Sequence, residues 1–348
     1  MDSSRKSDEA IISWLLEGDA SIQYQVYRDL LGADPPTLAA LQRRISQEGW
    51  GAGFLARQGA NGHWGRGFYQ PKWTSTHYTL LDLKCLGLSR DNPGARRAVQ
   101  MMFDPSMDRE GAVNYAVTKR PPDVCINGMA LGYASYFRVA DPRIHGIVDY
   151  LLRVEMPDHG WNCEFIHGAT HSSMHSTISV LEGLLEYRRW VEQEATEPEG
   201  CARDHSAFPQ RGSGCVRLEA IRQAEARGVE FILCHRLFLS DHTNEVIKPQ
   251  FLMLSYPSRW HYDILRGLDY FQAAGIPYDD RMAPALAVLV KKRRTDGTWP
   301  LQRKHPGNVH FDMEQIGEPS RWNTLRALRV MKAYAQLMPA PWSMGRYD

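Results

Sequence analysis

The stretch Phe54-Leu-Ala-Arg-Gln58-Gly-Ala-Asn-Gly62-His-Trp64 joins an apolar helical segment to a glycine turn that ends on a tryptophan. Similar joints occur at Gly160-Trp161 and at Asp296-Gly-Thr-Trp299, and a weaker copy occurs at Asp108-Arg-Glu-Gly111. The three tryptophans lie 97 and 138 residues apart, which corresponds to two and three units of about 46–48 residues. Recurrence at this period, with two helices per unit, indicates a stacked or closed helical repeat.

The segments between these turns have apolar residues at helical spacing, for example in 76–88 and 175–192, and none shows sustained alternation of period two. The sequence therefore predicts an all-α fold. About six helix pairs fit in 348 residues, enough to close an α/α toroid, a barrel whose inner helices line a central cavity. We expect a single toroid domain spanning residues 1–348. The alternative, an open solenoid of the HEAT type, does not use Gly-x-Trp turns.

Residues 191–213 interrupt this rhythm. The segment is polar, contains Pro and Gly and has no periodicity. Because the repeat resumes in phase after it, we expect a surface loop insertion there rather than a domain boundary.

The composition limits the classes of partner. Lys and Arg number 41 against 40 Asp and Glu, so the chain lacks the basic surplus of a nucleic-acid-binding protein. No apolar stretch approaches the roughly 18 residues of a membrane span, and the N-terminal stretch has no apolar signal-peptide core. We expect a cytoplasmic protein with no membrane span and no nucleic-acid partner.

The glycine-tryptophan turns resemble motifs of a known superfamily. The stretch from Gln58 to Trp64 resembles the QW repeat of squalene–hopene cyclases, and Asp296-Gly-Thr-Trp299 resembles the turns of protein prenyltransferase β subunits. The resemblance implies the α/α toroid of the terpenoid cyclases and prenyltransferases. The chain has neither the Asp-x-Asp-Asp motif of squalene-type cyclases nor the DDxxD motif of class I terpene synthases.

A second resemblance concerns a metal. Asp123-Val-Cys125 opens an apolar segment and resembles the Asp-x-Cys of prenyltransferase β subunits, where this pair binds zinc together with a later histidine. His175, which also precedes an apolar segment, matches that histidine. Arg120 takes the place of the family's diphosphate-binding lysine and is the implied substrate-binding residue, whereas the family's neighbouring Arg and Tyr are Val117 and Ile126 here.

The residue types support the same metal independently of the resemblance. Thiolate, imidazole and carboxylate are the donors that zinc prefers, and a thiol at a helix N-terminus has a lowered pKa. Cys163 follows Gly160-Trp161 on the connection between the two ligand helices and is a further soft donor. We therefore expect a Zn²⁺ site of Asp123, Cys125, Cys163 and His175. The alternative is that Asp123 is a helix cap, Cys125 a core residue and His175 a capping or hydrogen-bonded histidine.

Polar and aromatic residues also mark the starts of other predicted inner helices, and in a closed toroid these starts converge on one mouth. We expect His77, His261 and Asp263 to act in catalysis there. The predicted substrate-binding residues at this mouth are Trp73, Tyr78, Trp260, Trp322 and Asn323. The alternative is that these residues are packing signatures of the repeat. His305 is expected to be an exposed loop residue.

These residues lead to two hypotheses of function. The first is a zinc-dependent prenyltransferase- or cyclase-like enzyme whose metal activates a thiol or water for attack on an apolar substrate such as an isoprenoid. A related candidate is a lanthipeptide cyclase acting on a peptide, but Cys234-His235 is followed by Arg236 instead of the expected glycine. The second is a non-catalytic toroid that binds a lipid or peptide, with a structural metal or none.

No two cysteines of the chain form a C-x-x-C pair, so zinc-ribbon and thioredoxin-type motifs are excluded. Apart from the candidate ligands, Cys85 and Cys234 are expected to be buried and Cys201 and Cys215 to lie in loops.

Overall fold

The computed structural model describes residues 8–115, 121–196, 211–334 and 337. Helices dominate this part of the chain, and its only strands are the two-residue β1 (Trp299–Pro300) and β2 (Pro319–Ser320), which pair antiparallel. The all-α prediction is confirmed at this level. The chain divides into two compact units, each discontinuous in sequence. The single closed toroid stays a prediction.

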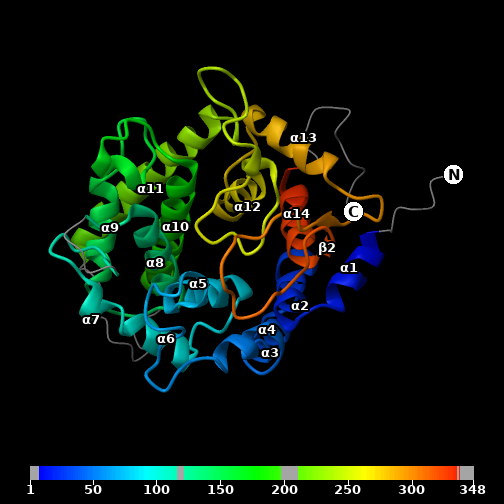
Figure 1. Cartoon of the computed structure of the whole chain (residues 1–348), viewed down its shortest axis with the longest axis horizontal. Coiled ribbons are helices and arrows are strands. Elements are labelled where there is room, and N and C mark those ends of the chain that lie inside the picture. Colours follow the sequence, from blue (N-terminus) through cyan, green and yellow to red (C-terminus); the bar gives the residue numbers. More distant parts are fainter. Residues whose placement is uncertain (1–7, 116–120, 197–210, 335–336, 338–348) are drawn as a thin grey trace. The chain divides into compact units, whose positions relative to one another are not determined.

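The first unit comprises Met1–Ala56, Cys85–Ser89 and Leu233–Asp348. Its helices are α1 (Asp8–Leu16), α2 (Ala20–Val26), a π-helical turn (Tyr27–Leu31), α3 (Pro35–Arg44), α4 (Gly49–Leu55), α12 (Ile264–Ala274), α13 (Ala283–Lys291) and α14 (Arg321–Tyr334), with short 3₁₀ turns at Pro249–Leu252 and Asp280–Met282. Helix α14 packs against α12 and α2 (Figure 1).

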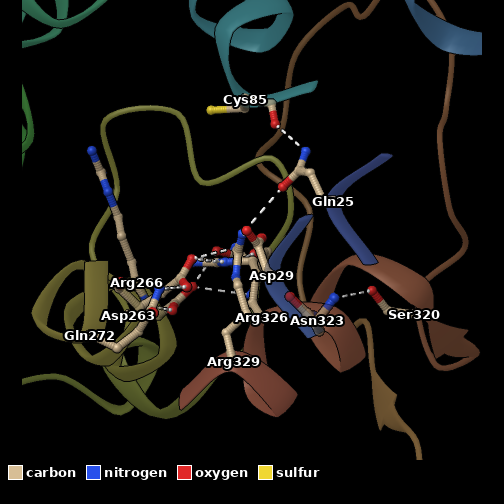
Figure 2. A network of polar contacts seen from close by, with 12 residues as sticks. Gln25, Asp29, Cys85, Asp263, Arg266, Gln272, Ser320, Asn323, Arg326 and Arg329 are labelled. Carbon is tan, nitrogen blue, oxygen red and sulfur yellow. Dashed lines mark hydrogen bonds and ion pairs between the residues drawn. The ribbon is translucent and has the colours of Figure 1, made fainter. Parts of the chain in front are cut away.

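Ion pairs connect α14 to α12 and to the π-helical turn. Arg329 lies 2.8 Å from Asp29 of the π-helical turn and 3.0 Å from Asp269 of α12. The buried Arg326 contacts the same Asp269 carboxylate at 3.1 Å, and Arg329 also donates to the side chain of Gln25 in α2 (Figure 2). Because each charge is partly or fully buried and paired, this network fixes the packing of the N-terminal helices on α14.

The second unit comprises Arg57–Lys84 and Arg90–Ile232. Its helices are α5 (Thr76–Leu86), α6 (Pro93–Gln100), α7 (Phe103–Ser106), α8 (Val124–Tyr136), α9 (Ile144–Arg153), α10 (Met174–Thr196) and α11 (Arg211–Cys234), with 3₁₀ turns at Lys72–Thr74 and Cys163–His167. The last two residues of α5 and of α11 belong to the first unit.

Helices α8 and α10 form the most extensive helix pair of this unit (Figure 1). A Cβ atom on Gly128 would lie 2.5 Å from the carbonyl oxygen of Ser179, and one on Gly132 would lie 3.6 Å from the Cα of Gly183. Both pairs have the same offset of 51 residues, so the two helices run parallel in a fixed register. The glycines permit this close approach, and it brings the first turns of α8 and α10 to the same level.

The predicted loop at 191–213 is helical at both ends, which corrects the sequence-based boundaries. Helix α10 continues to Thr196 and α11 begins at Arg211, whereas 197–210 lies outside the described residues. The helix continues through this polar stretch because its side chains pair one turn apart. Glu192 lies 3.2 Å from Arg188, and Glu194 accepts a hydrogen bond from the Trp190 indole.

One hydrogen bond closes every glycine turn of the repeat. The backbone amide of the turn residue donates to a side-chain oxygen in the first turn of the helix that follows. The four cases are Trp64 to Thr76 (3.0 Å), Trp161 to Thr177 (3.0 Å), Trp299 to Thr324 (2.9 Å) and, in the weak copy, Val113 to Asn127 (2.8 Å). The recurrence read from the sequence is therefore a structural repeat, and it occurs in both units.

None of the described helices has the length and apolar character that a membrane-spanning helix requires.

Candidate metal centre

The first turns of α8 and α10 and the 3₁₀ turn Cys163–His167 bring two thiols into contact. The backbone amide of Cys125, the second residue of α8, donates to the sulfur of Cys163 at 3.3 Å. The hydroxyl of Ser176, the third residue of α10, lies 3.4 Å from the same sulfur. The sulfur of Cys163 thus lies at the N-terminal ends of two helices, where backbone amides and the helix dipoles favour negative charge.

The two thiols have opposite tendencies to ionise. A hydrogen bond from the Cys125 thiol lowers the pKa of Cys163, and the Ser176 hydroxyl and the Cys125 amide act in the same direction. The same thiol contact raises the pKa of Cys125, as do burial and the negative charges of Cys163 and Asp123. When one proton is lost from the pair, the negative charge therefore resides on Cys163 and the proton on Cys125.

Asp123 and His175 flank this pair. Asp123 occupies the N-cap position of α8, but its side chain makes no capping hydrogen bond to the helix, and it is exposed. In the register of the two helices, Cys125 of α8 lies opposite Ser176 of α10. His175, which is half-buried, is the residue next to Ser176 in the sequence. Among the described residues, no three His, Cys, Asp or Glu side chains already surround a common metal position. A metal site here therefore requires Asp123 and His175 to turn toward the two sulfurs.

The donor set nevertheless fits zinc. Two half-buried thiols are in contact, one of them with a lowered pKa, and a carboxylate and an imidazole lie on adjoining residues. The alternative role of Cys125 as a core residue does not describe a half-buried thiol hydrogen-bonded to a second thiol.

The other cysteines differ from expectation. Cys85 and Cys234 are exposed, because each lies in the last turn of its helix. Cys215 lies within α11 and not in a loop, and Cys201 lies outside the described residues.

A cluster of aromatic rings lies in the same unit as the thiol pair. Burial is the main reason that the pKa of Tyr69 is raised to about 12, and the charges of Cys125, Asp123 and Cys163 add to it, so Tyr69 lies within electrostatic range of the thiols. The Tyr69 ring lies 5.8 Å from each of two predicted site residues, His77 and Tyr78. A third predicted residue, Trp73, packs edge-to-face on Tyr78 at 4.7 Å.

His77 is completely buried in this cluster. Its Nδ1 lies 3.2 Å from the hydroxyl of Tyr133, which also contacts the hydroxyl of Tyr115, while its Nε2 is buried with no hydrogen-bond partner in the described part of the chain. Burial lowers the pKa of His77 to about 3, so the imidazole is neutral at physiological pH. A neutral imidazole with one unused nitrogen can bind or exchange a proton with a polar group placed beside it.

The remaining predicted catalytic residues lie in the first unit. Asp263 caps α12 by accepting hydrogen bonds from the amides of Arg266 (2.9 Å) and Ser255 (3.1 Å) and from the Ser255 hydroxyl (2.6 Å) (Figure 2). The ring of His261 stacks 3.7 Å from Trp260 and 3.7 Å from His305. His305 is buried in this stack, so the expectation that it is an exposed loop residue is wrong.

The two predicted substrate-binding residues of α14 are buried. Trp322 stacks on Tyr256 at 4.5 Å. The backbone amide of Asn323 donates to the Ser320 hydroxyl (Figure 2), and the side-chain amide of Asn323 donates to the carbonyl of Pro300. Arg120 lies outside the described residues. A single mouth shared by all the predicted site residues stays a prediction.

No protein-family model matches the sequence, and no similar protein was found among curated proteins. Inference about function therefore depends on the thiol pair and the aromatic cluster. Sequence reasoning identified both thiols and three members of the cluster but missed Tyr69, Tyr115 and Tyr133.

Proposed function

We propose that this chain is a zinc-dependent enzyme acting on an apolar substrate, with Cys125, Cys163 and His175 as metal ligands and Asp123 beside the metal. The observation that carries the proposal is the contact of Cys125 with Cys163, two soft donors 38 residues apart in the chain, at paired helix N-termini. Two thiols with an imidazole and a carboxylate form a donor set typical of zinc.

The residues of the chain have separable tasks in this proposal. The Cys125 amide and the Ser176 hydroxyl orient the sulfur of Cys163 and favour its anionic form, which is the form that binds a metal. Bound zinc supplies a Lewis acid that lowers the pKa of a coordinated thiol or water. Three protein ligands leave one position of a tetrahedral site for that group. The exposure of Asp123 favours such an open site.

The aromatic cluster supports an apolar substrate. The half-buried Tyr69 and the buried Tyr78 and Trp73 form an apolar ring cluster in the same unit as the thiols. The buried, neutral His77 lies within this cluster and has one nitrogen without a partner. Such a site suits a substrate that is mostly apolar, such as an isoprenoid, and has one polar group near its reacting atom.

A second candidate is the non-catalytic protein that binds a lipid or peptide around a structural metal. The observation in its favour is that four potential donors lie at the starts of α8 and α10 and on the 3₁₀ turn between them, because a metal closed by four protein ligands has no position for a substrate. The number of protein ligands distinguishes the two candidates.

Elemental analysis tests the metal. We expect about one zinc per chain in protein purified without added zinc or chelator, and little zinc in the variants Cys125→Ala, Cys163→Ala and His175→Ala. Cys85→Ala, which removes an exposed thiol of the first unit, is the matched control and should retain the metal. Stoichiometric zinc in Cys125→Ala and His175→Ala, or none in the wild type, would end the proposal.

X-ray absorption at the zinc edge tests the function. Two sulfurs, one nitrogen and an exchangeable oxygen from water support the enzyme. A carboxylate oxygen that disappears in Asp123→Ala supports the structural metal.

A further inference from the structure

We propose that Cys125 and Cys163 are also an oxidative modification site, at which a hydroperoxide forms a reversible disulfide that removes both sulfurs from metal binding. The formation of the disulfide does not depend on the metal. Its effect on metal occupancy rests on the function proposed above.

The geometry permits the bond without a change of fold. The backbone nitrogen of Cys125 lies 3.3 Å from the Cys163 sulfur. Since an N–Cα bond measures about 1.46 Å, the Cα of Cys125 lies at most about 4.8 Å from that sulfur. A disulfide also requires the two Cα atoms to lie about 4.4–6.8 Å apart, which rotation of the two side chains and a small shift of the turn that carries Cys163 can provide. Cys163 lies in a short 3₁₀ turn instead of a long helix, which eases this adjustment.

The pair is both accessible and asymmetric. Both cysteines are half-buried, so a small oxidant can reach them. The Cys125 amide and the Ser176 hydroxyl both point at the sulfur of Cys163 and make it the attacking atom. Cys125, in contact with that sulfur, is placed to complete the reaction as the resolving thiol.

The reaction has two steps. The sulfur of Cys163 attacks the terminal oxygen of a hydroperoxide, forming an S–O bond as the O–O bond breaks and an alcohol leaves (water, if the oxidant is hydrogen peroxide). The thiol of Cys125 then attacks the resulting sulfenic acid, the S–S bond forms, and the hydroxyl leaves with the thiol proton as water. Two thiols and one hydroperoxide thus yield one disulfide, one alcohol and one water, and a dithiol reductant reverses the change.

Peptide mapping by mass spectrometry tests the disulfide. Protein as purified is treated with a small excess of hydrogen peroxide, and the expected product is a cross-linked peptide pair that contains Cys125 and Cys163 and disappears with dithiothreitol. In Cys125→Ser the sulfenic acid on Cys163 should persist and be trapped by dimedone. The control Cys85→Ala/Cys234→Ala, which removes the two exposed thiols, should form the disulfide in wild-type yield.

Absence of that cross-link in the wild type, or its replacement by a pairing with another cysteine, overturns the proposal whatever the state of the variants. Zinc released during oxidation is followed in parallel with a chromogenic chelator, and we expect release in step with the disulfide and rebinding after reduction. A disulfide in protein that never contains zinc would refute the proposed function and leave the modification site standing. Oxidation without loss of bound zinc would refute the switch.

Discussion

Replacing His77 by asparagine should flatten the dependence of folding stability on acidic pH. The folded protein holds the pKa of His77 at about 3 because the ring is completely buried, whereas the ordinary value is 6.5. Asparagine places an amide near the position of Nδ1, the nitrogen that contacts Tyr133. The asparagine amide can therefore keep a hydrogen bond to Tyr133, but it has no ionisable group that titrates between about pH 3 and pH 7.

The sign and the magnitude follow from proton linkage. Above pH 6.5 both states are neutral at this residue and it contributes no pH dependence. Below that pH the unfolded chain binds a proton that the folded chain excludes, so the free energy of unfolding falls by about 1.4 kcal/mol per pH unit until the folded pKa is reached. At pH 5 the accumulated loss is about 2 kcal/mol relative to neutral pH.

Urea unfolding between about pH 5 and pH 7.5 measures this loss as the difference between wild type and variant. The variant is destabilised at every pH by the smaller side chain, but the gap should narrow by about 2 kcal/mol toward pH 5. His242→Asn, which removes an exposed histidine, is the matched control and should keep the wild-type slope. A gap for His77→Asn that stays constant with pH would show that His77 accepts a proton in the folded state and would refute its burial in a neutral form.

Three further changes test the helix pair, the repeat and the metal centre. Gly183→Ala would place a Cβ 2.2 Å from a backbone oxygen of α8 and should lower the free energy of unfolding by about 1–3 kcal/mol, whereas Gly132→Ala makes an ordinary 3.6 Å contact and should change it little in the same denaturation assay. Thr177→Val removes the acceptor for the buried Trp161 amide and should destabilise by about 1–3 kcal/mol in thermal or urea unfolding. Ser176→Ala removes the hydroxyl beside the Cys163 sulfur and should weaken zinc affinity by about 10–100-fold in a competition titration with a chelator.

The sequence predicts the helices and the turns because both are local. Apolar residues at helical spacing and the Gly-x-Trp joints are contained within short windows, and the structure repeats the same hydrogen bond at each joint. The partner of that bond was not predicted. Thr76 follows Trp64 by 12 residues, whereas Thr324 follows Trp299 by 25, so no fixed spacing reveals it.

In the candidate site, too, a local motif predicts some residues and the sequence does not reveal others. Cys125 was predicted from a short motif, and its contact with Cys163 agrees with the expected neighbourhood. Tyr69 and Tyr115 come from irregular segments between helices, where nothing in the sequence fixes the direction of a side chain. Asp263 shows an ambiguity of the sequence, because an acidic residue before a helix serves equally well as a cap. In the structure its carboxylate caps α12 through the Arg266 amide and also accepts hydrogen bonds from Ser255.

The repeat that builds the fold also sets the register of the candidate metal ligands. Asn127 of α8 and Thr177 of α10 bind the amides of the preceding turns and so fix the first turn of each helix. Cys125 and His175 each lie two residues before these positions. They therefore occupy the same place in two repeats whose helices pack parallel at a constant offset.

The other two repeats have different residues two positions before the bonded threonine. Two residues before Thr76 lies Thr74, and two residues before Thr324 lies Trp322, which stacks on Tyr256. Neither side chain is a zinc ligand of the usual kinds. Thr74 lies in the 3₁₀ turn that precedes α5, whereas Cys125, His175 and Trp322 are each the second residue of their helix. The scaffold thus offers this helix-start position three times, and the α8–α10 pair fills it with a thiol and an imidazole, with Cys163 supplied by the turn between them. This is why the metal chemistry we propose is confined to the second unit, whereas the first unit fills its equivalent position with an aromatic ring.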